Sequence, residues 1–195
     1  MGTRRLAAEF LVALVSLASV LSCSQKTQER VVQYATYNSD GISIEYPGAW
    51  RDVSNSADAE TMKMKIASGL AQFNRTLLSF AAFALPNDEG VLSLSKVQLQ
   101  AEVTDNDILS ERSQVHADAT RDGYVTKVNT LTKARIKEWP AIVEDVELSN
   151  GGRAHCVKVI ARGFYVELSM SLDKSQYQKY VTAYNHSLES LQITQ

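Results

Sequence analysis

The chain has 195 residues, of which 45% are hydrophobic and 22% are charged, and its formal net charge is −2. This composition is typical of a globular protein that is long enough to bury a sizeable core. The small negative charge and the absence of any Lys/Arg run argue against nucleic acid and anionic lipid surfaces as partners.

The first 22 residues have the pattern of a secretory signal peptide. Arg4 and Arg5 supply a positive start, and every residue from 10 to 21 is apolar or small. A bilayer-spanning helix needs about 20 apolar residues, so this run is too short to span but suits the apolar core of a signal. We therefore predict that residues 1–22 target the chain for export.

The apolar run ends in Val20-Leu21-Ser22-Cys23, which resembles the lipobox of bacterial lipoproteins. In that family cleavage precedes the cysteine, and its sulfur carries a diacylglyceryl group. Leu21 departs from the pattern, because a smaller residue is commoner there. The resemblance implies lipidation at Cys23. The alternatives are a cysteine discarded with the signal and an N-terminal anchor that is never cut.

Lipidation would hold the protein at a membrane, since two or more acyl chains such as palmitate anchor stably. The resulting organisation is a signal peptide at 1–22, a lipidated N-terminus and tether at 23–38, and one globular domain at 39–195. We expect the domain to be lipid-anchored in the bacterial cell envelope, facing the periplasm or the exterior. The membrane, through Cys23, is then the first partner, and an envelope protein is a second.

The first half of the domain shows strand, helix and strand patterns in turn. Ile42 and Ile44 alternate with polar residues as in a strand that a Pro-Gly turn closes. Helical spacing follows over residues 56–73, with Ser56 or Asp58 as the N-cap. Residues 76–85 form a nearly continuous apolar strand, which predicts cover on both faces, and residues 91–97 alternate as a further strand.

A second helix is predicted to start near Thr104, with Asp107 completing a partial capping box, and to stop at Gly123. The segments at 124–131 and 141–149 are strand-like. They precede Asn150-Gly151-Gly152, the strongest hairpin signal in the chain.

The hairpin signal allows two strand registers. A turn at Gly151-Gly152 sets Glu147 opposite Cys156, Val146 opposite Val157 and Asp145 opposite Lys158, and this register pairs opposite charges. A turn at Asn150-Gly151 sets Asp145 opposite Cys156 instead. In both registers Cys156 shares a face with Asp145 and Lys158.

The last strand alternates from residue 164 to 172, and a closing helix follows Asp173, which we expect to cap it with Gln176 completing the capping pattern. Its apolar residues form one stripe that should pack on the sheet: Tyr177, Tyr180, Val181, Tyr184, Leu188 and Leu191. Three helices and about seven strands, mostly linked by hairpins, predict an α+β fold with an antiparallel β-sheet.

No motif for catalysis, cofactor binding or metal binding is found. His116, His155 and His186 lie in three different predicted elements, without metal-ligand spacing. The carboxylates of Glu144, Asp145, Glu147 and Glu167 could serve acid–base chemistry, but alternation along strands favours the solvated face of a sheet. Cys156 lies in a strand-like run and is expected to be a small buried side chain.

With this layout, residues 40–193 resemble the PsbP/Mog1-like fold. Its members often begin with a strand ending in Tyr-Pro-x-x-Trp, which is Tyr46, Pro47 and Trp50 here, and a mid-chain strand like EWPAIVEDVEL and a closing amphipathic helix also match. The resemblance implies an α/β/α sandwich with helices on both faces of the sheet. It also implies a small non-enzymatic accessory or binding protein, and no residue inherits a function from the family.

Two function classes follow. The first is a membrane-anchored bacterial lipoprotein that acts in the cell envelope as a binding or accessory module without catalysis. The second is an envelope hydrolase or carbohydrate-active enzyme with an unrecognised site. A cleft with perturbed carboxylates, or with a histidine in hydrogen-bond reach of a nucleophile, would favour the second class.

Overall fold

The computed structural model describes residues 32–99 and 103–194. The predicted signal peptide, Cys23 and residues 24–31 lie outside the described residues. In the ranges that are described, no helix is long and apolar enough to cross a membrane. The globular unit begins at Gln33, and its first strand, β1 (Tyr34–Ser39), pairs with β2 (Ile42–Pro47). Strand β1 therefore includes residues that the sequence assigned to the tether ending at residue 38.

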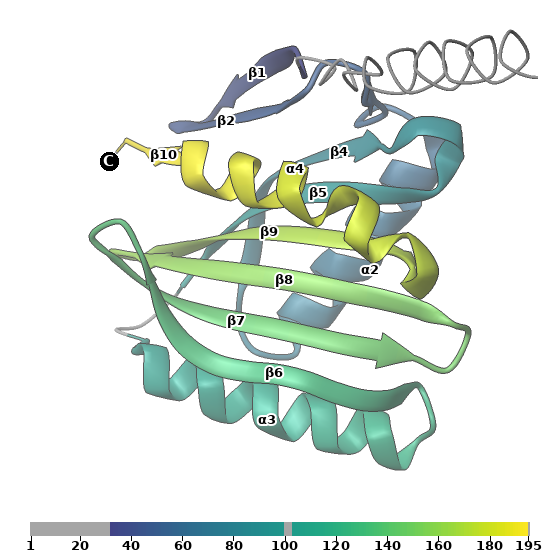
Figure 1. The fold of residues 1–195 in the computed structure, drawn as a ribbon. Coiled ribbons are helices and arrows are strands. Elements are labelled where there is room, and N and C mark those ends of the chain that lie inside the picture. Colours follow the sequence, from purple (N-terminus) through teal and green to yellow (C-terminus); the bar gives the residue numbers. More distant parts are fainter. Residues whose placement is uncertain (1–31, 100–102, 195) are drawn as a thin grey trace, which may run out of the picture. The chain divides into compact units, whose positions relative to one another are not determined.

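A seven-stranded antiparallel sheet forms the centre of this unit (Figure 1). Its strand order is β3-β4-β5-β9-β8-β7-β6. The strands are β3 (Arg51–Asp52), β4 (Thr76–Ala84), β5 (Gly90–Gln98), β6 (Val125–Ile136), β7 (Trp139–Leu148), β8 (Gly152–Ala161) and β9 (Phe164–Asp173). A second sheet of three strands, in the order β1-β2-β10, includes the short β10 (Gln192–Ile193) near the C-terminus.

Helices cover both faces of the seven-stranded sheet. Helices α2 (Ala57–Ala71) and α3 (Asp105–Arg121) lie on one face. Helix α4 (Tyr177–Ser190) lies on the other face together with the small sheet (Figure 1). The predicted fold class, α+β with a seven-stranded antiparallel sheet between helices, is confirmed, and the sequence did not indicate the separate small sheet.

Helices α2 and α3 begin where their capping residues predict. Ser56 accepts a hydrogen bond from the Ala59 amide, and Thr104 and Asp107 form a complete capping box. Asp173 accepts from the Ser175 amide and so caps the short 3₁₀ turn η2 (Lys174–Gln176), from which α4 continues. Gln176 makes no side-chain cap hydrogen bond, so the capping pattern expected of it does not form. Another 3₁₀ turn, η1 (Pro86–Asp88), joins β4 to β5.

The closing helix packs as its stripe predicts. Tyr177, Tyr180 and Tyr184 are buried, and the Tyr184 hydroxyl donates to the Leu168 carbonyl oxygen at 2.9 Å. Leu188 is partly buried in the same core. Trp50 is also buried there and lies edge-to-face with Tyr180.

The β7–β8 hairpin differs from both predicted registers. Its loop has three residues, Ser149 to Gly151, with Gly151 at φ 83° and its amide donating to the Leu148 carbonyl. Three-residue hairpin loops commonly end in such a left-handed glycine. In the observed register Glu144 faces Cys156, Asp145 faces His155, and Glu147 faces Arg153.

This register changes which residues share a face, because a shift of one residue turns a strand's side chains over. The pairings of Val146 with Val157 and of Asp145 with Lys158 are therefore wrong. Glu144, not Asp145, lies on the face that carries Cys156 and Lys158. That face is the one under α3.

Candidate functional site

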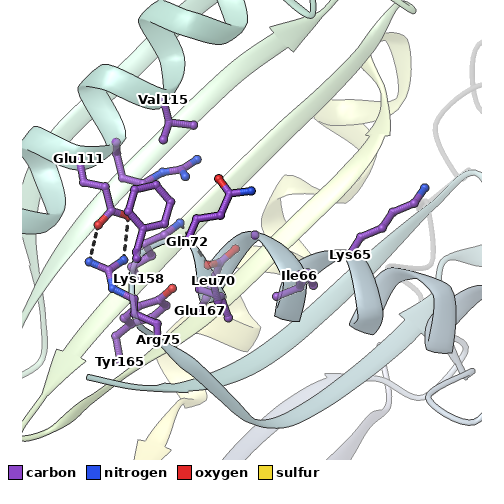
Figure 2. Close-up of a pocket in the computed structure, with 13 residues that line it drawn as sticks. Lys65, Ile66, Leu70, Gln72, Arg75, Glu111, Val115, Lys158, Tyr165 and Glu167 are labelled. Carbon is purple, nitrogen blue, oxygen red and sulfur yellow. Dashed lines mark hydrogen bonds and ion pairs between the residues drawn. The ribbon is translucent and has the colours of Figure 1, made fainter. Parts of the chain in front are cut away.

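A cleft of about 350 Å³ lies between α2 and α3, over one face of the sheet (Figure 2). This volume is at the lower end of the roughly 300–1,000 Å³ that is usual for small-molecule sites. The lining residues come from both helices, from the segment between α2 and β4, and from β8 and β9: Lys65, Ile66, Gly69, Leu70, Gln72, Phe73, Arg75, Glu111, Arg112, Val115, Lys158, Tyr165 and Glu167.

Helix α2 forms an apolar wall that is only partly covered. Ile66 and Leu70 are half-buried, and Phe73 is 41% exposed. Gly69 also lines the cleft, and a Cβ at this position would meet no atom within 4 Å. A glycine inside a helix costs about 1 kcal/mol of stability relative to alanine. Packing does not require a glycine at position 69, since an alanine side chain would fit there.

The floor of the cleft contains a buried lysine. Lys158 on β8 is 4% exposed, and its Nζ lies 2.7 Å from Glu144 Oε1 and 3.2 Å from Glu167 Oε2. Burial alone would lower the pKa of Lys158, but the negative charges of Glu167 and Glu144 outweigh it and raise that pKa well above its usual range. Lys158 is therefore a permanent cation at neutral pH.

Glu144 holds this cluster together. It is 3% exposed and accepts hydrogen bonds from Arg112 Nε and His116 Nε2, each at 2.9 Å. Burial alone would raise the pKa of Glu144, but the charge of Lys158 and the hydrogen bond from His116 outweigh it and hold that pKa well below its usual range. Since the ionised carboxylate only accepts hydrogen bonds, His116 carries a proton on Nε2.

Cys156 is the thiol of this cluster. It is buried, as predicted, and its Sγ lies 3.2 Å from Lys158 Nζ. Burial, followed by the negative charge of Glu167, raises the pKa of the Cys156 thiol well above its usual range. The thiolate is the reactive form of cysteine, so the environment keeps Cys156 unreactive.

A second ion pair lines the cleft. Arg75, just before β4, contacts Glu111 on α3 through both guanidinium Nη atoms, with Nη1 2.7 Å from Oε1 (dashed lines in Figure 2). The Arg75 guanidinium also lies 5.7 Å from the ring centroids of both Phe73 and Tyr165. Burial, then the charge of Glu167, raises the pKa of Tyr165 to about 12.

The opposite face of β7 and β8 carries a separate polar cluster under α4. Asp145 is 3% exposed and contacts Arg153 Nε and His155 Nδ1, each at 2.9 Å. Burial would raise the pKa of Asp145, but hydrogen bonds from Arg153 and Asn129 outweigh it and lower that pKa. The Arg153 guanidinium stacks 3.4 Å from the Tyr177 ring centroid.

These positions correct the prediction that the strand carboxylates lie on a solvated face. Glu144 and Asp145 are buried and ion-paired, because α3 covers one face of the sheet and α4 the other. Burying a carboxylate has a large desolvation cost unless the charge is paired. Here a basic partner for each carboxylate offsets that cost.

The three histidines lie apart, each beside a different carboxylate. His116 contacts Glu144, His155 contacts Asp145, and His186 contacts Glu45. Among residues 32–99 and 103–194, no group of three or more His, Cys, Asp or Glu side chains has a metal-binding arrangement. Within the same ranges, no histidine ring hydrogen-bonds a serine, threonine or cysteine side chain.

The cleft is a preformed cavity, and three ionisable groups in it or directly beneath it, Arg112, Lys158 and Glu144, are held in their charged states. Ionised Glu144 only accepts hydrogen bonds, and charged Lys158 and Arg112 only donate them. This arrangement suits recognition of a polar ligand more than proton transfer, which needs a pKa near the working pH.

Comparison with solved structures places the domain in the PsbP-like fold. The cyanobacterial PsbP protein CyanoP from Synechocystis matches with a TM-score of 0.57 and 10% identity, over 89% of this chain and 99% of that protein. LpqN, described as involved in cell envelope biogenesis of Mycobacterium tuberculosis, matches with a TM-score of 0.52 and 12% identity, over 89% and 97%.

A third solved structure, PA94 of Pseudomonas aeruginosa, matches with a TM-score of 0.53 and 13% identity, over 84% of this chain and 99% of that one. At these identities the likeness concerns the fold alone. No family model and no curated protein matches the sequence.

Proposed function

We propose that the protein is a bacterial lipoprotein, anchored by lipid on Cys23, whose domain acts in the cell envelope as a non-catalytic binding module. The observation that carries the binding role is the preformed cleft between α2 and α3, which is lined by the cations Arg112 and Lys158 above the ionised Glu144. The lipobox-like residues before Cys23 support the anchor. The PsbP-like fold, shared with LpqN, a Mycobacterium tuberculosis protein involved in cell envelope biogenesis, is compatible with both.

Glu144 under the cleft is a carboxylate with a perturbed pKa, the feature expected of the hydrolase alternative, but the direction of its shift favours the binding role. A general acid needs a carboxyl whose pKa is raised toward neutrality, and a thiol nucleophile needs a lowered pKa. Here the pKa of Glu144 is lowered and the pKa of the Cys156 thiol is raised. These shifts oppose general-acid catalysis by Glu144 and nucleophilic attack by Cys156.

The anchor is tested by expressing the full chain in a bacterium fed an alkyne-labelled palmitate. We expect label on the wild-type protein and on Cys156→Ala, the matched control, and none on Cys23→Ala. Mass spectrometry should find the mature chain starting at a diacylglyceryl-modified Cys23. An unmodified residue 23, or a retained Met1, would show that the anchor is wrong.

The binding role is tested by cross-linking in intact cells, followed by purification of the protein from the envelope fraction. We expect a specific envelope component to be captured with the wild-type protein, and less of it with Cys23→Ala, which is released from the membrane. Hydrolysis of an envelope polymer by the purified protein would instead favour the enzyme class.

A further inference from the structure

We propose that the cleft between α2 and α3 binds a small organic anion, in which a carboxylate or phosphate group is joined to a compact apolar body. The inference rests on the proposed binding function and specifies its ligand. It follows from three features of the cleft, which are its excess of positive charge, the free end of Arg112 and the open apolar wall at Gly69.

Positive charge exceeds negative charge around the cleft. Four cationic side chains line it, Lys65, Arg75, Arg112 and Lys158, against the two carboxylates of Glu111 and Glu167. Including Glu144 beneath the floor gives four cations against three anions, a net charge of +1. A ligand group entering this space therefore meets a positive field, which favours an anion.

Arg112 provides the hydrogen-bond donors for that anion. Its Nε contacts both carboxylate oxygens of Glu144, and no residue in the described ranges accepts a hydrogen bond from its Nη atoms. The side chain is 23% exposed and lines the cleft. A guanidinium held at Nε presents its two outer nitrogens as a fixed fork, the geometry that binds carboxylate or phosphate oxygens in pairs.

Lys158 cannot take the same role, because its ammonium group is already occupied. Its Nζ contacts Glu144, Glu167 and the Cys156 sulfur, which matches the three donors of an ammonium group. Lys158 therefore contributes positive charge at the floor of the cleft, while Arg112 donates hydrogen bonds to the bound anion.

The apolar part of the ligand has a wall to lie against. The apolar lining comprises Ile66, Leu70, Phe73, Val115 and Tyr165. Figure 2 shows Ile66 and Leu70 on α2 and Val115 on α3, on opposite sides of the space. Gly69 leaves the α2 side open, since nothing lies within 4 Å of where its Cβ would be. A compact ring or short branched chain fits such a wall.

The probe is 2-naphthoate, which carries one carboxylate on a compact apolar ring, with binding to the full-length chain measured by isothermal titration calorimetry. 2-Naphthyl phosphate tests the other anionic group. 2-Naphthamide is the neutral control of the same shape, and inorganic phosphate is the control that lacks the apolar body. We expect one or both naphthyl anions to bind at least about tenfold more tightly than the amide and than phosphate.

The first pair of variants tests the open space beside Gly69 without destabilising α2. Gly69→Leu places a side chain in the open space, whereas Gly69→Ala adds only a methyl group. Both substitutions raise helix propensity, so neither should lower the melting temperature. We expect Gly69→Leu to weaken anion binding at least about tenfold, and Gly69→Ala to change it much less.

The second pair tests the guanidinium fork. Arg112→Lys keeps the positive charge beside Glu144 but removes the outer donors, while Arg121→Lys makes the same change on the exposed end of α3. We expect Arg112→Lys to weaken binding about tenfold and Arg121→Lys to leave it unchanged.

Three results would overturn the inference: neither naphthyl anion binds at millimolar concentration, the amide binds as well as the anions, or Gly69→Leu leaves binding intact. Failure of the anions together with normal acylation of Cys23 and capture of an envelope component would refute this ligand class alone. The proposed function would in that case stand.

Discussion

The buried ion cluster around Glu144 should contribute measurably to the free energy of unfolding, and Glu144→Gln tests this contribution. Glu144→Gln keeps the shape of the side chain but removes the negative charge that contacts Arg112, His116 and Lys158. Breaking a buried ion pair by removing one partner costs about 3–5 kcal/mol, because the remaining charge is left uncompensated. We expect about 3 kcal/mol here, the lower end of that range, since Lys158 retains Glu167 and Arg112 is partly exposed.

The free energy of unfolding is measured by urea denaturation at pH 7, followed by circular dichroism. For a domain of this size the denaturant slope is about 2 kcal/mol/M, so the unfolding midpoint should fall by about 1.5 M. Glu138→Gln, an exposed carboxylate between β6 and β7, is the matched control and should stay within about 0.5 kcal/mol of the wild type.

The same variant should change the dependence of stability on pH. Because the folded pKa of Glu144 is lowered, its contribution is complete above the unfolded pKa of about 4.5 and is lost as pH falls toward the folded value. The difference between wild type and Glu144→Gln should therefore shrink below pH 4.5, by about 2 kcal/mol at pH 3. A difference of under about 1 kcal/mol at pH 7, or one that stays constant in acid, would refute the structural role of the cluster.

Three further predictions concern other parts of the chain. Leu188→Ala should lower the free energy of unfolding by about 2 kcal/mol in the same urea assay, at the lower end for buried leucines because Leu188 is only partly buried. In a Cys23→Ala background, N-ethylmaleimide should modify Cys156 slowly in the native protein and quickly in urea, as followed by mass spectrometry. Fast native labelling would contradict its cover by α3. Deleting residues 24–30 should leave the melting temperature unchanged within error, because the globular unit begins at Gln33.

The elements could be predicted from the sequence because their signals are local. The capping box of Thr104 and Asp107 involves residues three positions apart, and it forms as expected. The stripe that includes Tyr180 and Tyr184 depends only on helical periodicity, and both residues are buried. Signals of this kind need no knowledge of the rest of the chain.

The strand pairing at Asn150-Gly151-Gly152 could not be settled in this way. Both two-residue turns are reasonable for these residues, and so is the three-residue loop that forms. A slip of one residue exchanges the two faces of a strand. The registers therefore differ in free energy because they bring different side chains against the helices that cover each face of the sheet. In the observed register Glu144 faces α3 and pairs with Arg112 of that helix. Asp145 faces α4 and pairs with Arg153 of the neighbouring strand β8, whose side chain lies on the same face.

The cleft also depends on contacts between residues that are far apart in the sequence. One feature of the sequence nevertheless indicates its charged floor. Arg112 and His116 are four residues apart, so they lie on one face of α3, and Ile108 places that face against the sheet. Basic side chains on the buried face of a helix need carboxylates opposite them, and a strand carrying adjacent acids is the natural source. Pairing these two observations would have predicted buried Glu144 and a charged floor, although not the opening beside Gly69. That opening exists only because α2 covers the sheet incompletely, and it is the part of the site on which a ligand would depend.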